Sequence, residues 1–358
     1  MDNIETETKE EQPPVHVTTE LLPDLLSTMT PSDLNSYLQI KRQKQGLMRD
    51  IPLSKLFFLF ERETTLNVIS HQVHLSETIE LIAGILVSED IRQYRGLLLN
   101  MERTAIYFYL FYWIFRFLNN FKSSRLALES YSSFWFFFEF LWKLQFPWGL
   151  IRPGAIPHPI IHTQIPEIQK SINIQQKHAW KIAKSIEKKT TTKKTLKEVK
   201  NLTLDVVKKT GITGPFARAS GTTPPSVGSS SFFKRKSAQD FLKYTYATEN
   251  NLLNVLRVSY TELILSLDQI SRLLKEYSIV YQETSNFLNG EATTSFSTTL
   301  GESHLTLNIL DNQVTYFNFI PPQMLNITGV VESLSTCPSS LQSVILLFFD
   351  PEFIINLG

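Results

Sequence analysis

An aromatic block between Ala105 and Leu150 constrains the fold of this chain more than any other feature. Phe, Tyr and Trp are concentrated there in two runs, separated by a polar break at Asn119-Asn120. A transmembrane helix needs about 20 uninterrupted apolar residues. Neither run is that long, because Arg116 ends the first and Glu139 and Lys143 interrupt the second. Since unpaired charges in lipid are costly, the block favours two helices buried in the protein or against a neighbour over a helical hairpin that dips into a bilayer.

The composition excludes some classes of site. The 358 residues are 42% apolar, which is enough for one large domain or two smaller ones. A net charge of +1 gives no overall attraction to nucleic acid or anionic lipid. Cys337 is the single cysteine, so neither a disulfide framework nor a cysteine-rich metal site can form within this chain. Residues 1–18 are polar and acidic, which predicts a disordered tail, no secretory or transit signal, and a protein that faces the cytosol.

Apolar periodicity predicts a mainly helical protein with a small β element near its C-terminus. One apolar helix face runs from Leu75 to Leu86, a second helix is expected over about Glu89 to Leu118, and another over about Ala247 to Tyr277. Two strand-like runs within 306–319 flank the turn dipeptide Asp311-Asn312. This pattern predicts a β-hairpin.

Lysine is concentrated between Lys170 and Lys200 and in the short patch Lys234–Lys236. Such stretches can bind nucleic acid or anionic lipid. Stacking residues are not interleaved with the lysines as a single-strand binder requires, so a solvated helix face is the simpler interpretation. Breaks in the pattern predict flexible linkers near 187–195 and 222–237.

Familiar catalytic motifs are missing from the sequence. It contains no glycine-rich phosphate loop, nucleophile elbow or zinc-type histidine pair. His71 and His74 lie three residues apart, but no carboxylate or cysteine completes a recognisable ligand set, so packed or surface histidines are expected. Glu80 lies on the apolar side of its helix and should be paired. Arg103 and Arg62 are its predicted partners, in a structural ion pair rather than a proton path.

The segment Gly211–Gly221 has the composition of a site. Three glycines and Pro215 fix a tight backbone path with little bulk, and Arg218 is the strong charge within it. A plain loop between two helices is the alternative interpretation of the same composition.

Landmarks along the chain follow an order that is typical of one protein family. They are an Arg–His spacing, a Glu–Gly pair, an Arg followed by Glu-Arg, an Arg-Pro-Gly loop, the turn described above, a long-helix set and a C-terminal set. In chain order they are Arg62 and His71; Glu80, Gly84 and Val87; Arg95, Glu102 and Arg103; Arg152-Pro153-Gly154; Gly214-Pro215 with Arg218-Ala219-Ser220-Gly221; Arg257, Glu262 and Ser266; and Gly301-Glu302, Pro322, Asn326 and Asp350-Pro351. From about Lys41 to Pro351 the chain thereby resembles the large subunit of membrane-bound group 4 NiFe hydrogenases and its homologue, the quinone-site subunit of respiratory complex I.

The sequence differs from this family at the positions that hold the family's metal centre or quinone. The resemblance places the nickel–iron ligands at Thr64, Asn67, Glu352 and Ile355, and none of these is a thiolate. Because soft thiolates hold such a centre, no nickel–iron cluster is expected. The His-Pro-x-Thr-His-Gly turn and the head-group tyrosine of the complex I homologue are not evident either, and Thr65 stands near the tyrosine position.

The resemblance implies a fold and a role. The fold is mainly α, a helical bundle core of the NiFe-hydrogenase large-subunit type with a small C-terminal β-hairpin (α+β) and an N-terminal sheet that is reduced or missing, in one domain over 19–358. The role is that of a non-metal-binding subunit in a membrane-associated NADH:quinone oxidoreductase- or hydrogenase-like complex, structural or quinone-site-like and not catalytic by itself. A stand-alone helical scaffold or anionic-membrane-binding protein without redox activity is the alternative.

The resemblance also implies partners and site residues. An iron–sulfur small subunit with a 4Fe-4S cluster and membrane-arm subunits are the expected partners, at the cytoplasmic face of the membrane, where this chain would be peripheral. No cofactor is expected to be resident in the chain, a quinone is the ligand that the resemblance suggests, and no nucleic acid is expected. The motif residues expected to be structural or pocket-lining are Arg62, His71, Glu80, Arg103, Arg152, Gly214, Pro215, Arg218, Ser220, Gly221, Arg257 and Asp350.

Overall fold

The computed structural model describes most of the region between residues 48 and 326. The described residues are 48–62, 66–145, 150–157, 160, 162–188, 193–194, 196–197, 207, 214–219, 251–276, 289–322, 324 and 326. The predicted tail at 1–18, the linker near 222–237 and the patch Lys234–Lys236 lie outside these residues, and so does much of the linker near 187–195.

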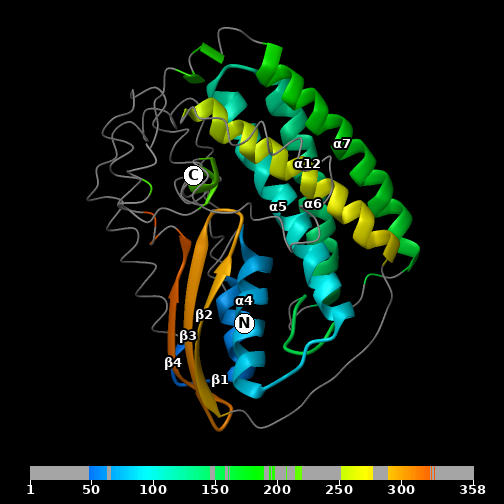
Figure 1. Ribbon diagram of the computed structural model, residues 1–358. Helices are drawn as coiled ribbons and strands as arrows, with labels where there is room; N and C mark the ends of the chain where they lie inside the picture. Colours follow the sequence, from blue (N-terminus) through cyan, green and yellow to red (C-terminus); the bar gives the residue numbers. More distant parts are fainter. Residues whose placement is uncertain are drawn as a thin grey trace, which may run out of the picture.

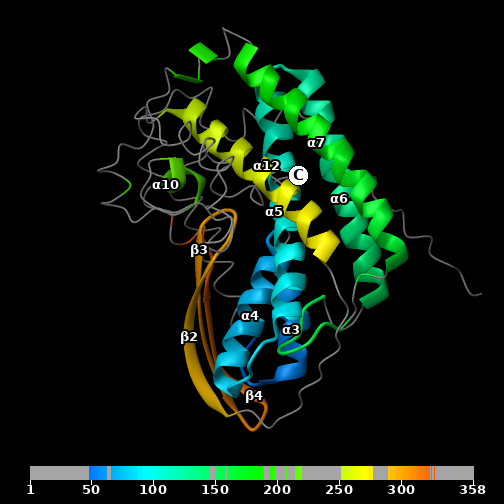
Figure 2. The ribbon, with the colours of Figure 1, turned by 45° about the vertical axis from the view of Figure 1, so that its right-hand side comes forward.

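The structure is mainly helical with a small antiparallel sheet, as the sequence predicts. Its elements in chain order are β1 (Ile51–Pro52), α3 (Leu53–Arg62), α4 (Val68–Ala83), α5 (Glu89–Phe117), α6 (Phe121–Gln145), the 3-10 helix η2 (His162–Gln164), α7 (Ile165–Lys188), α10 (Pro215–Ala219), α12 (Leu252–Glu276), β2 (Gly290–Ser297), β3 (Glu302–Leu310) and β4 (Gln313–Ile320). Figures 1 and 2 show the long helices α5, α6, α7 and α12 gathered on one side, and the sheet on the other side with α4 against it.

Helix α5 is the centre of the helical bundle. It begins after Ser88, whose hydroxyl accepts a hydrogen bond from the N–H of Ile91, and acidic Glu89 and Asp90 occupy its first turn, where they favour the helix dipole. It packs against α6 and α12, and α7 packs across both of these. The first half of the aromatic block lies in α5 and is mostly buried, as expected, with Tyr112 and Trp113 half-buried. Within the described residues, no helix combines the length and the apolar character that a membrane span needs.

The sheet has the strand order β1-β4-β3-β2 and is antiparallel throughout. The predicted hairpin is β3 and β4, and both turn residues, Asp311 and Asn312, have positive φ (50° and 61°), as a two-residue hairpin turn of type I′ requires. The inner face of the sheet packs on α3 and α4 in a second apolar core that includes Leu75 and Phe317. Strand β2 was not predicted, because its sequence GEATTSFS is rich in Ser and Thr and has little apolar alternation.

One helix boundary differs from the predicted periodicity. The apolar face that starts at Leu75 was expected to include Leu86, but α4 ends at Ala83 and Leu86 is 91% exposed. Gly84 adopts a left-handed conformation (φ 64°), and its N–H bonds back to the last turn of the helix. Glycine is the residue that caps a helix in this way, so the helix ends where the periodic pattern alone would continue it.

Candidate functional site

The candidate site lies where the tip of the β2–β3 hairpin meets α5, α10 and α12. The tip, Thr298–Gly301, is buried, which is unusual for a hairpin loop, and satisfies its own polar groups. The Thr298 hydroxyl donates to the carbonyl of Gly301 (2.8 Å) and accepts from the N–H of Leu300 (3.2 Å). Figure 2 shows α10 beside this end of the sheet.

Gly214 allows α10 to approach the hairpin tip. Its φ is +88°, and a Cβ at this position would lie 2.2 Å from the carbonyl oxygen of Leu300. Pro215 then starts the short helix, a position where its missing N–H costs nothing. The side-chain amide of Asn254, on α12, donates to the carbonyl of Ala219 (3.1 Å) and holds the other end of α10. The described part of the predicted turn, residues 214–219, is therefore a spacer of defined shape. Ser220, Gly221 and residues 211–213 lie outside the described residues.

Arg218 joins the three surrounding elements. Its Nε lies 2.6 Å from Glu262 Oε1 on α12, and its Nη2 donates to the Tyr107 hydroxyl on α5 (3.1 Å) and to the Thr299 carbonyl at the hairpin tip (2.7 Å). The Tyr107 hydroxyl in turn donates to the second carboxylate oxygen of Glu262. All three side chains are buried. We call Tyr107, Arg218 and Glu262 the central triad.

The electrostatics of the central triad favour a fixed ion pair. Burial by itself lowers the pKa of Arg218, but the charges of Glu262 and Tyr107 and the hydrogen bonds to them together outweigh this effect, and the pKa is raised. Burial, followed by the same carboxylate charge, raises the pKa of Tyr107. Arg218 thus stays protonated and Tyr107 stays a neutral phenol that donates to Glu262, which is an arrangement suited to holding elements together.

A second pair of charges lies one turn back along α5. The Glu102 carboxylate accepts the N–H of Ile69 (2.5 Å), the N–H of Ser70 (3.0 Å) and the Ser70 hydroxyl, so it caps the first turn of α4. Burial outweighs these hydrogen bonds and raises the pKa of Glu102 to about 7. Arg103 donates to Asn100 Oδ1 (3.3 Å), and burial lowers its pKa against the opposing charge of Glu262.

Asn67 stands at the start of α4, beside Glu102, at one of the positions where the family resemblance places a metal ligand. It is fully buried and makes no side-chain cap to its own helix. Among the described residues, neither its amide nitrogen nor its amide oxygen has a hydrogen-bond partner. Buried polar atoms of this kind call for an explanation, such as a ligand or an ordered water. Thr64, Glu352 and Ile355, the other three positions, lie outside the described residues.

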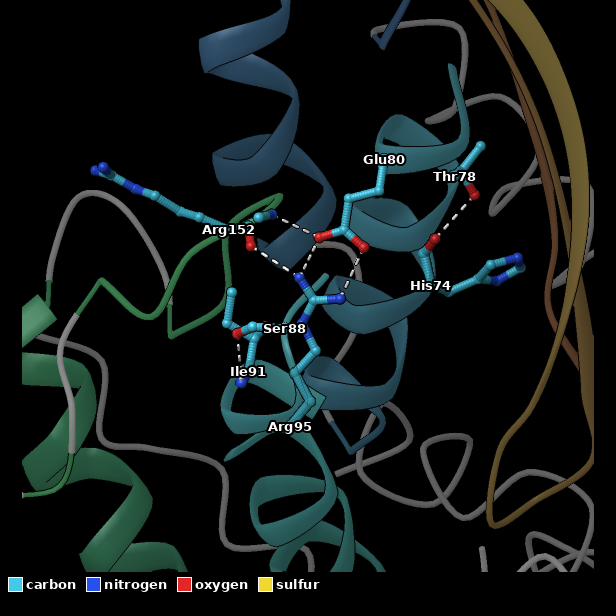
Figure 3. A network of polar contacts seen from close by, with 8 residues as sticks. His74, Thr78, Glu80, Ser88, Ile91, Arg95 and Arg152 are labelled. Carbon is cyan, nitrogen blue, oxygen red and sulfur yellow. Dashed lines mark hydrogen bonds and ion pairs between the residues drawn. The ribbon is translucent and has the colours of Figure 1, made fainter. Parts of the chain in front are cut away.

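Glu80 forms a separate clamp, and its partner differs from the prediction. Arg95, and not the predicted Arg103, meets the carboxylate with both terminal nitrogens, one of them 2.9 Å from Oε2. The carboxylate also accepts the N–H of Gly154 (2.6 Å), and Arg95 donates to the main-chain carbonyl of Arg152 (2.9 Å). Figure 3 shows this network, with the Arg152 side chain pointing away from the carboxylate. The prediction of Arg103 was wrong because Arg103 lies two turns further along α5, where it donates to Asn100 and feels the charge of Glu262 in the central triad.

The two histidines of α4 face the sheet. The His71 ring packs on Phe60 and Phe319, with ring centroids 5.8 and 4.8 Å away. His74 bonds to Ser303 through Nδ1 (3.0 Å) and to Thr294 through Nε2 (2.9 Å), and burial lowers its pKa to about 4. Within the described residues, no group of three His, Cys, Asp or Glu side chains could hold a metal ion.

Arg257 lies at the surface, away from the central triad. Its guanidinium meets Glu187 of α7 at 2.9 and 3.1 Å, and Lys193 reaches the same carboxylate (2.5 Å). The side chain of Arg62 and the whole of Asp350 lie outside the described residues.

Sequence reasoning missed Tyr107 as a site residue, because its hydroxyl belongs to a residue within an aromatic run. The available signal was its i, i+4 spacing from Arg103.

Comparison with known proteins finds a relationship in structure alone. No family model matches the chain, and no curated protein matches it. Among the solved structures, a chain of the membrane-bound sulfane sulfur reductase, an archaeal respiratory membrane complex, matches with a TM-score of 0.67. This protein shares the fold of that chain. The match covers 86% of this chain and 85% of the reductase chain at 16% identity, so it extends over nearly the whole of both.

Proposed function

We propose that this protein is a non-metal-binding homologue of the large subunit in a membrane-associated redox complex of the NADH:quinone oxidoreductase or hydrogenase kind. The observation that carries the proposal is the near end-to-end similarity in fold to a chain of a respiratory membrane complex. The order of the family landmarks in the sequence supports it independently. In this role the chain is a peripheral subunit on the cytoplasmic face.

The residues present do not fit a nickel–iron centre. Such a centre is held by soft thiolates, whereas the four corresponding positions are Thr64, Asn67, Glu352 and Ile355. Asn67 offers only a carboxamide, which is a poor ligand for soft metals. No step of the proposed function therefore passes through a metal held by this chain.

The buried polar groups support a structural or quinone-site-like role. Arg218 and Glu262 neutralise each other and hold α5, α10, α12 and the hairpin tip in one arrangement. At the start of α4, Asn67 presents a buried amide that has no hydrogen-bond partner among the described residues and that can both donate and accept a hydrogen bond. A ligand with carbonyl or hydroxyl oxygens, such as a quinone head group, has the chemistry to complete these hydrogen bonds.

The proposed partners follow from this role. An iron–sulfur small subunit with a 4Fe-4S cluster would bring electrons close to the chain, and membrane-arm subunits would anchor it. The resemblance suggests no nucleic acid as a partner, and we propose none.

Affinity purification of the tagged, full-length chain from its own membranes in mild detergent tests the proposal. We expect an iron–sulfur protein and multi-span membrane proteins to co-purify, with a cluster signal in electron paramagnetic resonance and no stoichiometric nickel. A chain that is isolated alone, without an iron–sulfur partner, would contradict the complex. Nickel bound in stoichiometric amount would contradict the non-metal assignment.

The quinone-site-like part has its own test. A photoreactive quinone analogue should label the purified complex close to Asn67, and Asn67→Ala should reduce that labelling. Ser76→Ala, which alters another buried polar residue of the same helix, is the matched control. Equal labelling of both variants and the unaltered protein would reject a quinone contact at Asn67 and leave the structural role.

A further inference from the structure

The outer face of α7 carries a continuous row of lysines. The helix buries one side, including Ile172, Ala179 and Ile186, against α6 and α12. The opposite side carries five exposed lysines at successive spacings of 7, 4, 3 and 4 residues, which place them on one line along the helix. The row consists of Lys170, Lys177, Lys181, Lys184 and Lys188. At 1.5 Å per residue it is about 27 Å long.

Nothing in the described part of the chain balances the charge of this lysine row. None of its members forms an ion pair there. Of the two acidic residues of α7, Glu187 is already paired with Arg257 and Lys193, and Glu167 lies in the first turn of the helix. Like charges three and four residues apart on a helix repel and destabilise it. The row is therefore an unfavourable arrangement that an anionic surface would relieve.

Two apolar side chains flank the lysine row. Ile174 is 43% exposed, and Trp180 is 50% exposed with its inner edge against Tyr260 of α12. Lysines with exposed Trp and aliphatic side chains on one helix are typical of interfacial helices, whose apolar groups enter the boundary between head groups and acyl chains. Figures 1 and 2 both show α7 along the outer edge of the helical bundle.

The chemistry of the lysine row distinguishes among anionic partners. It contains no arginine, the residue that grips individual phosphates with a two-pronged geometry. A straight row of flexible point charges suits a flat and diffuse negative surface. We infer that the outer face of α7 lies along the head groups of an anionic membrane, with Ile174 and Trp180 at the lipid boundary. This inference rests on the proposed membrane-associated complex and specifies which side of the chain meets the lipid.

Vesicle flotation of the full-length chain tests the inference. The vesicles contain phosphatidylcholine alone or phosphatidylcholine with phosphatidylglycerol, at low and high salt. We expect binding to the anionic vesicles only, and binding that fades as salt rises. Replacing the centre of the row by Lys177→Gln, Lys181→Gln and Lys184→Gln should weaken binding on the order of 100-fold, given about 1 kcal/mol per lysine at such a surface.

A matched variant controls for the loss of charge. Arg49→Gln, Lys55→Gln and Arg92→Gln remove three exposed positive charges elsewhere on the chain and should leave binding within about twofold of the unaltered protein. Binding that both triple variants lose equally would overturn the inference, and so would the absence of binding by the unaltered chain. Tighter binding of a DNA duplex or of polyglutamate, with the same dependence on the row, would assign the face to those partners instead.

Tryptophan emission gives a second, local readout. Trp180 should shift to shorter wavelength when anionic vesicles are added, and the shift should vanish in Trp180→Phe. A shift that persists in this variant would place the lipid contact elsewhere. The result can be told apart from that of the proposed function. Co-purification without vesicle binding rejects only this inference. Vesicle binding by a chain that purifies alone rejects only the complex.

Discussion

Removing the guanidinium of Arg218 is the most informative change to the candidate site. In Arg218→Ala, Glu262 keeps the hydrogen bond from Tyr107 but loses its counter-charge in a buried environment. The carbonyl of Thr299 at the hairpin tip loses its donor as well. The substitution therefore removes a contact between the hairpin tip of the sheet and the helical bundle.

The expected magnitude follows from the burial of both partners. The Arg218 and Glu262 side chains are only 3% and 2% exposed, so solvent screens them little. Breaking such a pair by removing one partner costs about 3–5 kcal/mol, because the remaining charge stays buried. The lost bond to Thr299 adds about 1 kcal/mol. A total of about 4–6 kcal/mol is a large part of the roughly 5–15 kcal/mol by which a typical domain is stable.

Denaturant unfolding followed by circular dichroism measures this loss. The matched control is Arg257→Ala, which removes an arginine from a partly exposed pair and should cost no more than about 1 kcal/mol. Should Arg218→Ala fail to fold, Glu262→Gln tests the same contact with a smaller change of shape. A loss below about 1 kcal/mol in these variants would refute the structural role. A fully assembled complex that selectively loses turnover would point to a catalytic arginine instead.

Three further substitutions test other parts of the structure. Gly214→Ala should destabilise the fold by about 3 kcal/mol, measured as a lower melting temperature, because the new methyl group meets the Leu300 carbonyl at a positive φ; a neutral result would contradict the close approach. His74 has a native pKa of about 4 against 6.5 when unfolded, so it contributes stability above pH 6.5 that is lost as the pH falls toward 4, about 3 kcal/mol in all. His74→Gln should flatten this slope in urea midpoints measured across that range, and an unchanged slope would assign it to other groups. Glu102 has the opposite sign, because its pKa of about 7 lies above the unfolded value of 4.5 and stability is lost as the pH rises between the two, also by about 3 kcal/mol. Glu102→Gln should remove that loss, and a variant that still weakens from pH 4.5 to 7 would assign the loss to other groups.

The sequence predicted best those features that depend on local patterns. The helix expected over Glu89 to Leu118 is α5, because its apolar period and its Ser88 cap are both local. The β3–β4 hairpin followed from Asp311-Asn312, since few residues tolerate the turn's positive φ. The end of α4 was missed although Gly84 marks it, because apolar periodicity was followed past a capping glycine.

Pairings between distant segments were harder to predict. Glu80 and Arg95 meet across the connection between α4 and α5, and the sequence does not fix which arginine of α5 faces back. Tyr107 and Glu262 are 155 residues apart, and their contact depends on how α12 crosses α5. The order of the family landmarks identified Arg218 as notable, but its partners became evident only from the three-dimensional arrangement.

The buried hairpin tip has a consequence for how the chain matures during synthesis. Arg218 lies 81 residues before Thr299 and 111 residues after Tyr107, so its partners leave the ribosome at very different times. Contacts between such distant residues form late, since the chain must first close long loops. Until the last part of the chain emerges, the pocket for Arg218 lacks the wall that the hairpin supplies. The nascent helical bundle is then open at the position where the hairpin tip closes it in the finished protein, and it exposes apolar surface of the kind that chaperones bind.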